Sequence, residues 1–528
     1  MRGESVVYTL SILIIFFVPL GKSEITTSMK NLYTFLASAL VMLLVGCATP
    51  ESGPTATYTN PVLGGDYPDP TIMREGNDYY MTHSAFDYQP GLTVFHSTDL
   101  VNWEPISYAL KTYLGSIWAP DICKYEDKYY IYFTVAHPKG RMNFVTWAES
   151  PYGPWSDPID LKVGNIDPCH VVGEDGSRWL FMSAGKRVRL TDDGLAILPE
   201  TMETVYAGWQ YPEEWLTEGM CLEGPKLRKI GEYYYYLNAE GGTAGPPTSH
   251  MVVVARSKSI NGPWEDSPFN PLVHTYDAAE RWWSKGHGSL IDTPDGDWWV
   301  VYHAYENGFT NLGRQTLMEP VVLGEDGWFH PVVKDVAEPI AAPLPLNEKV
   351  DRKAHIGEFR LGYEWKFYKS FNPERVSVVD GVLTLQGKGT RAADSSPMMF
   401  VAGEHAYEIE AEIELHGDVT AGLLLVYNSD FFQGTGFNKE RRMRYRKGGE
   451  SGRGRSAEKM WLRLRNDHHI VTGEYSFDGE NWERETWGMM INGYDHNTLY
   501  EFQSVLPGVF CAGEGYATFK NFKYRSLE

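Results

Sequence analysis

The sequence has 528 residues, which exceeds the usual size of one domain and predicts two folded units. Lys and Arg number 47 and Asp and Glu number 69, so the formal net charge is −22, which disfavours nucleic acid and anionic membrane surfaces as partners. A neutral substrate fits this charge better, and the aromatic content of 14% suits stacking on sugar rings as well as filling a large core.

The first 47 residues are predicted to form a leader. From Met29 the sequence reads MKNLYTFLASALVMLLVGCATPESG, with an apolar run that is short for a membrane span. Its LVGC segment, Leu44 to Cys47, resembles a bacterial lipoprotein box. The resemblance implies cleavage before Cys47 and a lipid-anchored protein of the bacterial cell envelope, in the periplasm or at the outer-membrane surface. The earlier apolar run, residues 6–20, is interpreted as an upstream start or extended leader, and a transmembrane hairpin is the alternative. Residues 48–58 form a linker.

Five aromatic strands recur over residues 59–335. They are DYYMTHSA from Asp78, DKYYIYFTVA from Asp127, SRWLFMSAG from Ser177, EYYYYLNAEGG from Glu232 and DWWVVYHAYE from Asp297. Most of them follow a Gly- or Asp-containing hairpin turn, and helical periodicity is nearly absent. A repeat of several strands per unit is typical of a β-propeller, so the sequence predicts an all-β, five-bladed propeller.

One polar residue precedes each aromatic strand at a similar distance. In chain order these residues are Asp69, Asp121, Asp167, Glu223 and His287. Because the first strand of each propeller blade lines the central axis, equivalent positions are expected to converge on one cavity. The alternative is that each polar side chain caps a turn in a Pro- and Gly-rich segment. Five such residues in register favour the shared cavity.

Carboxylates gathered in a partly desolvated cavity have unequal pKa values, because burial and neighbouring negative charge raise some of them. Hydrolysis of a glycosidic bond needs two carboxyl groups with different pKa values. One carboxylic acid protonates the leaving oxygen, and a carboxylate on the opposite face attacks the sugar or activates water.

The motifs taken together are similar to the blade motifs of glycoside hydrolase family 43. They run from about Asn60 to Pro331 and read NPVLGGDYPDPTIMREGNDYYM, GSIWAPDICKYEDKYYIYFT, NIDPCHVVGEDGSRWLF, CLEGPKLRKIGEYYYYLNAEGG, KGHGSLIDTPDGDWWVVYHAYEN and LGRQTLMEPV. The resemblance implies that Asp69 is the general base, Glu223 the general acid, and Asp167 the carboxylate that tunes and orients the acid. The family is inverting, which implies a base-to-acid separation of roughly 6.5–9.5 Å.

Substrate contacts follow from the same resemblance. It implies that Phe86 and Trp118 wall the sugar pocket and that Arg314 donates to ring hydroxyls, and we place Asp121 beside them as a substrate-binding residue. The structural alternatives are that Trp118 belongs to the core and that Arg314 only pairs with Glu319.

The resemblance implies no required cofactor. Many family members hold a hydrated Ca²⁺ near an axial histidine, here His287, so a structural calcium held through water is an open expectation. A lone histidine is weak support for it, because calcium ligands are mostly oxygens. Cys169 and Cys221 each lie two residues from a predicted catalytic carboxylate and are interpreted as inert thiols.

The C-terminal part is predicted to be a second all-β domain. Residues 336–355 are rich in Pro and charge and form a linker. Over 356–528, strands such as AYEIEAEIEL and KMWLRLRNDHHIV alternate as in an antiparallel β-sandwich. AGLLLVYNSD and SFDGENWERE resemble the concanavalin-like domain of family 43 β-xylosidases, which can send a loop toward the pocket. The basic run Lys439 to Arg455 is expected to be an exposed hairpin or loop, with binding of an acidic glycan as the alternative.

The leading hypothesis is an inverting exo-glycosidase that removes terminal β-D-xylose or α-L-arabinofuranose from plant hemicellulose or its oligosaccharides. Three alternatives stay open. They are an endo-acting arabinanase or xylanase of the same family, a non-catalytic carbohydrate-binding propeller, and a retaining fructan-type hydrolase whose carboxyls would lie only about 5–5.5 Å apart.

Overall fold

The computed structural model describes residues 56–349, 351–485 and 488–528. The predicted leader, the lipoprotein box and most of the first linker lie outside the described residues. Among the residues that are described, no helix is both long enough and apolar enough to cross a membrane.

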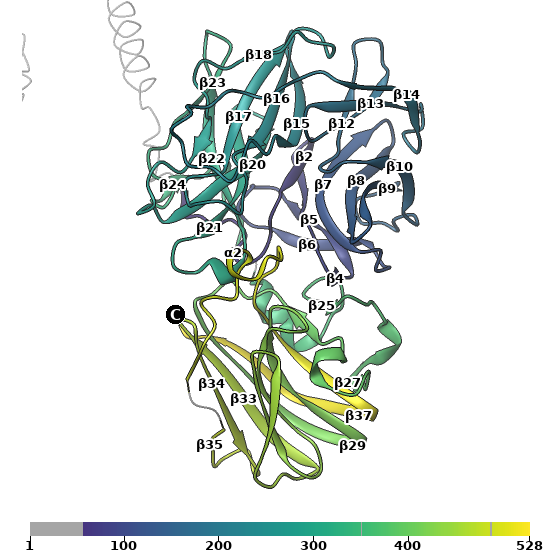
Figure 1. The fold of residues 1–528 in the computed structure, drawn as a ribbon, viewed down its shortest axis with the longest axis vertical. Coiled ribbons are helices and arrows are strands. Elements are labelled where there is room, and N and C mark those ends of the chain that lie inside the picture. Colours follow the sequence, from purple (N-terminus) through teal and green to yellow (C-terminus); the bar gives the residue numbers. More distant parts are fainter. Residues whose placement is uncertain (1–55, 350, 486–487) are drawn as a thin grey trace, which may run out of the picture. The chain divides into compact units, whose positions relative to one another are not determined.

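The five-bladed β-propeller predicted from the repeats is confirmed (Figure 1). Each blade is an antiparallel sheet whose strands are neighbours in sequence order. The first blade contains β2 Thr71–Glu75, β3 Asp78–Thr82, β5 Gly91–Ser97 and β6 Glu104–Leu110, and the second contains β7 Ser116–Tyr125, β8 Lys128–His137, β9 Gly140–Ala148 and β10 Ile159–Gly164. The third contains β11 Cys169–Val172, β12 Arg178–Met182, β13 Lys186–Leu190 and β14 Ile197–Thr204, and the fourth contains β15 Glu223–Ile230, β16 Tyr233–Glu240, β17 Met251–Ser257 and β18 Glu265–Asp266, with β19 Val273–His274 paired to β17. The fifth contains β20 Trp282–Asp292, β21 Trp298–Glu306, β22 Gln315–Leu323 and β23 Phe329–Pro331.

The N-terminal segment of the propeller is fixed to the last blade. β1 (Thr57–Tyr58) pairs with β24 (Ile340–Ala341), and Val62 donates its backbone N–H to Thr316 of β22 at 3.0 Å. The Tyr58 hydroxyl and the Asn60 amide both donate to the Met318 carbonyl. Because the same segment continues into the first blade at β2, it joins the last blade to the first and closes the ring.

The aromatic strands supply the core between blades. The second strand of each blade is the predicted aromatic one, and its burial is nearly continuous, as in β8 and β16. Tyr79, Tyr132, Tyr236 and Tyr302 from four of these strands are fully buried. Such strands are covered on both faces by neighbouring blades, which explains why they lack polar alternation.

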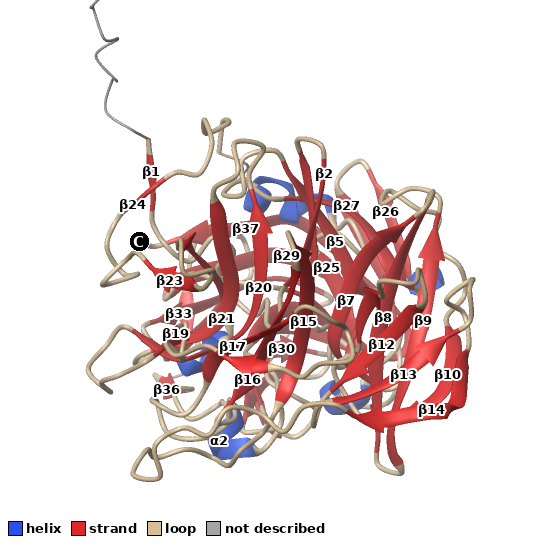
Figure 2. Ribbon diagram, turned by 90° about the horizontal axis from the view of Figure 1, so that it is seen from above, coloured by secondary structure: helices blue, strands red, loops and turns tan. Residues whose placement is uncertain are grey.

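The C-terminal β-sandwich is also confirmed (Figure 1, green to yellow). Figure 2 shows that strands, drawn in red, predominate and that the helices, in blue, are few and short. Its two longest strands, β29 Ala406–Val426 and β37 Leu506–Ser526, pair along most of their length. The other strands are β25 Trp365–Tyr368, β26 Val376–Val379, β27 Val382–Gln386, β28 Met398–Phe400, β30 Phe432–Phe437, β31 Arg442–Arg446, β32 Gly449–Arg453, β33 Lys459–Asp467, β34 Ile470–Ser476, β35 Glu483–Arg484 and β36 Met489–Met490. Short helices are η1 Thr310–Leu312, η2 Arg352–Glu358, η3 Pro373–Arg375, η4 Ala392–Asp394 and α2 His496–Leu499.

The sandwich and the propeller share a strand pairing. β4 (Tyr88–Gln89), which follows the first aromatic strand, pairs antiparallel with β25 of the sandwich. Val505 also donates its backbone N–H to Asn311 of η1 at 2.9 Å. These contacts fix segment 500–505 of the sandwich next to the loops of the last propeller blade.

The basic run forms the expected hairpin. It contains β31 and the fully exposed β32. Part of its charge is paired, because Arg442 contacts Glu485 at 2.5 Å and Lys439 contacts Glu458 at 3.0 Å.

Candidate functional site

In each blade, a residue within or just before the innermost strand has a positive φ, in the left-handed backbone region. These residues are Asp69 (φ 56°), Ala119 (φ 29°), Asp167 (φ 58°), Gly224 (φ 58°) and His287 (φ 56°). Left-handed backbone is unfavourable for residues other than glycine, and its recurrence at functional positions is typical of binding sites. The true register of the repeat is therefore set by these five positions.

The inference that all five polar residues occupy equivalent positions in their blades is wrong for two of them. Glu223 precedes the left-handed position of its blade by one residue, and Asp121 follows that of its blade by two. The distances to the aromatic strands vary because the connections between strands differ in length, so counting back from an aromatic residue does not give the structural register.

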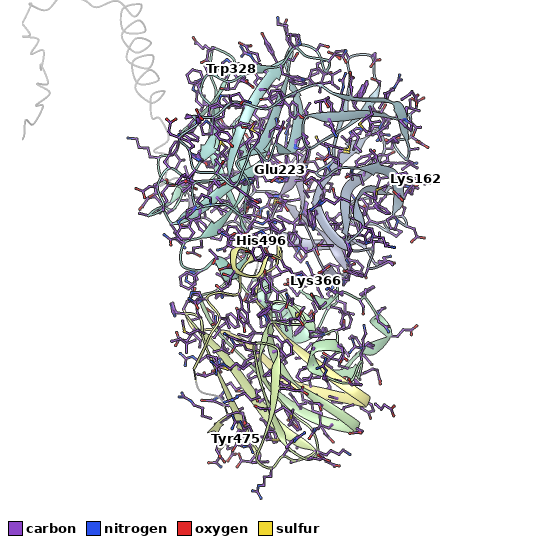
Figure 3. All side chains as sticks on the ribbon, in the orientation of Figure 1. Lys162, Glu223, Trp328, Lys366, Tyr475 and His496 are labelled. Atoms are coloured by element: carbon purple, nitrogen blue, oxygen red, sulfur yellow. The ribbon has the colours of Figure 1, made fainter. Side chains whose placement is uncertain are left out.

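One cavity of about 60 Å³ brings together most of the predicted site. Figure 3 labels one of its residues, Glu223, inside the propeller. The cavity contains the three predicted catalytic carboxylates, the two predicted wall aromatics, the arginine and the histidine. Its lining residues are Asp69, Phe86, Trp118, Ala119, Ile166, Asp167, Glu223, Thr243, His287, Arg314 and Phe502.

Asp69 is buried and held as an anion. Arg314 donates to it through Nη1 and Nη2 at 3.0 and 3.4 Å, and the Ser84 hydroxyl donates to Oδ2 at 2.5 Å. Burial alone would raise the pKa of this carboxyl, but the Arg314 guanidinium, together with His287 and His303, outweighs burial and holds the pKa well below its ordinary value. Asp69 is therefore ionised at neutral pH, as a general base must be.

Asp167 and Glu223 form a coupled pair. The Asp167 Oδ2 accepts hydrogen bonds from the Gly224 backbone N–H at 2.9 Å and from the Ser183 hydroxyl at 3.2 Å. The Gly224 bond fixes the backbone next to Glu223, so Asp167 can orient the acid without touching its carboxyl. Burial, followed by the charge of Asp69, raises the pKa of Asp167 to about 6.

The surroundings of Glu223 raise its pKa, whereas those of Asp69 lower the pKa of that residue. Burial raises the pKa of Glu223 well above the ordinary value, and the charges of Asp167 and then Asp69 add to the effect. The side chain is still partly exposed, so it can reach a ligand in the cavity. Because Asp167 accepts two hydrogen bonds, it is the better anion of the pair, and Glu223 keeps the proton.

Three aromatic rings wall the cavity. Phe86 and Phe502 are nearly parallel, with centroids 6.1 Å apart, and Trp118 meets Phe502 edge-on at 5.8 Å. The Trp118 indole is half-buried and donates to Ser116 at 2.9 Å, so it is not a core residue. Phe502 comes from the sandwich and was not predicted, although the resemblance implied that a loop of this domain reaches the pocket.

Arg314 lies in the cavity and pairs with Asp69, and the alternative of a pair with Glu319 is wrong. Glu319 interacts electrostatically with Tyr302 instead, and the carboxylate within ion-pair distance of Arg314 is that of Asp69. The guanidinium lies 5.5 Å from the Phe86 ring centroid and 5.0 Å from that of Phe502. It is thereby placed between the base and the aromatic wall.

His287 faces Asp69, with Nδ1 3.4 Å from the carboxyl Oδ1. Its Nε2 has no hydrogen-bond partner among the described residues, and burial lowers the pKa of the ring to about 3, so it is neutral. The ring also lies against Gly224, where a Cβ would be 3.0 Å away and φ is +58°, which favours glycine there.

The surroundings of His287 do not fit direct coordination of calcium. Calcium takes six to eight oxygen ligands, whereas the nearby groups are His250, His303 and Arg314, with a single carboxylate that Arg314 already pairs. In the described part of the chain, no group of three or more His, Cys, Asp or Glu side chains is arranged to hold a metal ion. An ion held by His287 through waters stays a prediction.

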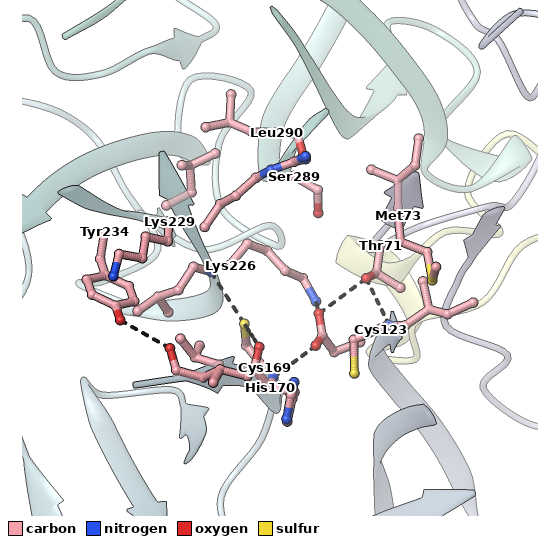
Figure 4. Close-up of a pocket in the computed structure, with 18 of the residues that line it drawn as sticks. Thr71, Met73, Cys123, Cys169, His170, Lys226, Lys229, Tyr234, Ser289 and Leu290 are labelled. Carbon is pink, nitrogen blue, oxygen red and sulfur yellow. Dashed lines mark hydrogen bonds and ion pairs between the residues drawn. The ribbon is translucent and has the colours of Figure 1, made fainter. Parts of the chain in front are cut away.

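Asp121 lies in a different cavity, and its placement beside the substrate is corrected. This axial cavity of about 530 Å³ is lined by the residues that follow each left-handed position by two, namely Thr71, Asp121, Cys169, Lys226 and Ser289 (Figure 4). Asp121 accepts from the Lys226 ammonium and from the His170 backbone N–H, both at 2.9 Å. It therefore joins innermost strands to one another and is not a lining residue of the catalytic cavity.

The thiols near the site are not activated. Burial raises the pKa of Cys169 far above its ordinary value and that of Cys221 to about 11. Both are thiols at neutral pH and poor nucleophiles.

Comparison with known proteins matches both parts of the chain. The sequence model described as "Glycosyl hydrolases family 43" matches residues 58–329, and that described as "Beta xylosidase C-terminal Concanavalin A-like domain" matches residues 358–525.

Individual relatives cover much of the chain. The non-reducing end alpha-L-arabinofuranosidase BoGH43B of Bacteroides ovatus is 31% identical over 388 residues, which are 68% of this chain and 71% of that protein. A putative beta-xylosidase of Escherichia coli is 28% identical over 565 residues, covering 89% and 99%. The crystal structure of the GH43 BlXynB protein from Bacillus licheniformis has a TM-score of 0.80 at 27% identity, covering 89% of this chain and all of that one.

Proposed function

Because the chain belongs to glycosyl hydrolases family 43, we propose that this glycoside hydrolase is an inverting exo-enzyme that removes terminal pentosyl residues from plant hemicellulose or its oligosaccharides. The observation that carries the proposal is that three carboxyl groups in one cavity have different pKa values. Asp69 has a low pKa, and Glu223 has a high one.

The proposed reaction uses Asp69 as the ionised base and Glu223 as the protonated acid. Asp69 removes a proton from a water molecule as that water attacks the anomeric carbon. Glu223 gives its proton to the glycosidic oxygen, so the leaving group departs as an alcohol. Asp167 raises the pKa of Glu223 and orients it through Gly224, and Arg314 keeps Asp69 ionised. The proton balance closes when Asp69 and Glu223 exchange protons with solvent.

The closure of the cavity supports exo action. Phe502 of the sandwich borders the same cavity as Phe86 and Trp118 and packs against both rings. A cavity walled on several sides accommodates the end of a chain, whereas an endo-acting enzyme needs an open cleft that a chain can cross.

The identity of the pentose is proposed from the relatives. Their names include an alpha-L-arabinofuranosidase, beta-xylosidases and proteins named "Xylosidase/arabinosidase". We therefore propose β-D-xylose or α-L-arabinofuranose as the terminal sugar.

Two substrates with different leaving groups distinguish the role of Glu223 from that of Asp69. Glu223→Gln should lose roughly a thousandfold in kcat on an unactivated disaccharide and much less on a nitrophenyl pentoside, because nitrophenolate departs without protonation. Asp69→Asn should lose a similarly large factor on both substrates, because both need the activated water. Near wild-type turnover of the disaccharide by either variant would contradict the proposal.

Attachment to the cell envelope is a separate proposal that rests on the LVGC segment ending at Cys47. Cys47→Ser should move the full-length protein from the membrane fraction to the soluble fraction of a bacterial host. An unchanged distribution would rule out a lipid anchor at this thiol.

A further inference from the structure

An aromatic cluster lies on the loop that leads into Glu223. Residues 205–222 connect β14 to β15 and carry Trp209, Tyr211 and Trp215. Trp215 stacks on His274 with centroids 4.6 Å apart and an angle of 6°, and Tyr276 meets both rings edge-on at 6.5 and 4.8 Å. These five residues are called the aromatic platform below.

Part of this cluster is unusually exposed. Tyr276 is 68% exposed, and Leu216, next to Trp215, is 73% exposed. Single exposed apolar residues are common on protein surfaces, but a contiguous and ordered group of rings marks a binding surface. The planar faces of such rings stack on the apolar faces of sugars.

The loop is tied to a strand end that borders the catalytic cavity. Trp209 donates its backbone N–H to Glu240 at 2.7 Å, and the Glu218 carboxyl accepts from the Ala244 N–H at 2.9 Å. Thr243, between these two partners, lines the cavity. At Gly242 a Cβ would lie 2.4 Å from the Glu218 carboxyl, so this close approach requires glycine. The loop that carries the platform is therefore hydrogen-bonded to the segment that supplies Thr243 to the cavity.

The position of Glu223 determines which part of a substrate reaches the loop. A general acid protonates the leaving-group oxygen, so the leaving group must lie beside Glu223. The loop ends at Glu223, and the charge of Glu218 on this loop contributes to the raised pKa of Glu223. Three residues of the platform are therefore carried by the segment that leads to the acid.

We propose that the aromatic platform binds the distal sugar rings on the leaving-group side of a neutral oligosaccharide substrate. The inference rests on the proposed function, because it needs Glu223 to be the acid.

The negative charge of residues 205–222 favours neutral oligosaccharides over acidic ones. Glu213, Glu214 and Glu218 are exposed, and residues 205–222 contain no Lys or Arg. His274 does not compensate, because burial lowers the pKa of its ring and keeps it neutral. A uronic acid side group near the platform would therefore meet like charge without a cation to pair with.

The test compares a long substrate with a short one. The values of kcat/KM are measured for a nitrophenyl pentoside and for the matching hexasaccharide, xylohexaose for a xylosidase or arabinohexaose for an arabinofuranosidase. In Trp215→Ala and Tyr276→Ala, the hexasaccharide-to-aryl ratio should fall by about tenfold. Tyr276→Phe keeps the ring and should keep the wild-type ratio.

Tyr152→Ala is the matched control, because Tyr152 is 57% exposed and lies in a blade turn apart from the cavity lining and the platform. It should leave the ratio unchanged. An unchanged ratio in both Trp215→Ala and Tyr276→Ala, or an equal fall in the control, would overturn the proposal. A lower hexasaccharide-to-aryl ratio in Tyr276→Phe would also overturn the proposal, because stacking needs only the ring and not the hydroxyl.

Failure of the proposed function is separable from failure of this inference. If the wild-type protein cleaves neither substrate, calorimetry measures xylohexaose binding to Glu223→Gln and to Glu223→Gln/Trp215→Ala. Binding that weakens with the Trp215 change supports the platform without catalysis, whereas equal binding or none overturns it. In the same assay a glucuronic acid-bearing oligosaccharide should bind more weakly than the neutral one, and equal binding would refute the charge argument.

Discussion

At the scale of single residues, the site depends on backbone that most residues avoid. Asp69, Asp167 and His287 have positive φ, and Glu223 stands one residue before the fourth such position, Gly224. The turn into each innermost strand thus directs its side chain to one end of the axis. The energetic strain is tolerated because the strands of five blades over-determine the backbone there.

Asp167→Asn is predicted to move the alkaline limit of activity. The pKa of Glu223 is raised by burial and then by the negative charge of Asp167, so removing that charge lowers the pKa. Glu223 then loses its proton at a lower pH, and the alkaline limb of the kcat profile should move to lower pH, with a roughly tenfold to hundredfold loss of kcat at neutral pH. A limb that stays in place or moves to higher pH would contradict this coupling.

At the scale of elements, the sequence allowed the blades to be predicted but not their register. The aromatic second strands are local patterns and repeat in the sequence, so the five blades were predictable. The register is marked instead by a residue that precedes Pro in four blades, as in Asp69-Pro70 and Ala119-Pro120. Ala119 is not polar, so the pattern of polar residues points to Asp121 in its place.

Asp121 is predicted to act in stability rather than in substrate binding. Its carboxylate and the Lys226 ammonium are both more than nine-tenths buried and 2.9 Å apart. Asp121→Ala leaves a buried cation without its partner and should destabilise the propeller by about 3–5 kcal/mol. Asp121→Ala/Lys226→Met should recover much of this loss, as measured by thermal unfolding. A fully stable Asp121→Ala protein with impaired substrate binding would instead support the original assignment.

At the scale of the whole molecule, the cavity is built by two domains. Phe502 belongs to the sandwich, stacks on His496 with centroids 3.8 Å apart, and lines the propeller cavity that contains Asp69 and Glu223. No local pattern could identify it, because its position depends on contacts such as Val505 with Asn311 and the pairing of β4 with β25. The role of such a residue is set by domain packing, which a single sequence does not reveal.

Phe502→Ala is predicted to weaken catalysis without unfolding the sandwich. It removes one ring of the aromatic wall that Phe502 forms together with Phe86 and Trp118, so kcat/KM on a nitrophenyl pentoside should fall by about tenfold or more. The matched control is Tyr500→Ala, because Tyr500 is two residues away and 85% exposed. An equal effect of the two changes, or none from Phe502→Ala, would show that the sandwich does not contribute to the sugar pocket.

The stereochemistry of hydrolysis tests the central claim most directly. Asp69 as a base acting through water, and Glu223 as the acid on the opposite face, give a product whose anomeric configuration is inverted. Proton NMR during the first minutes of hydrolysis, before mutarotation, should show α-xylose from a β-D-xyloside or the β-anomer from an α-L-arabinofuranoside. A first-formed product that retains the configuration of the substrate would contradict the account.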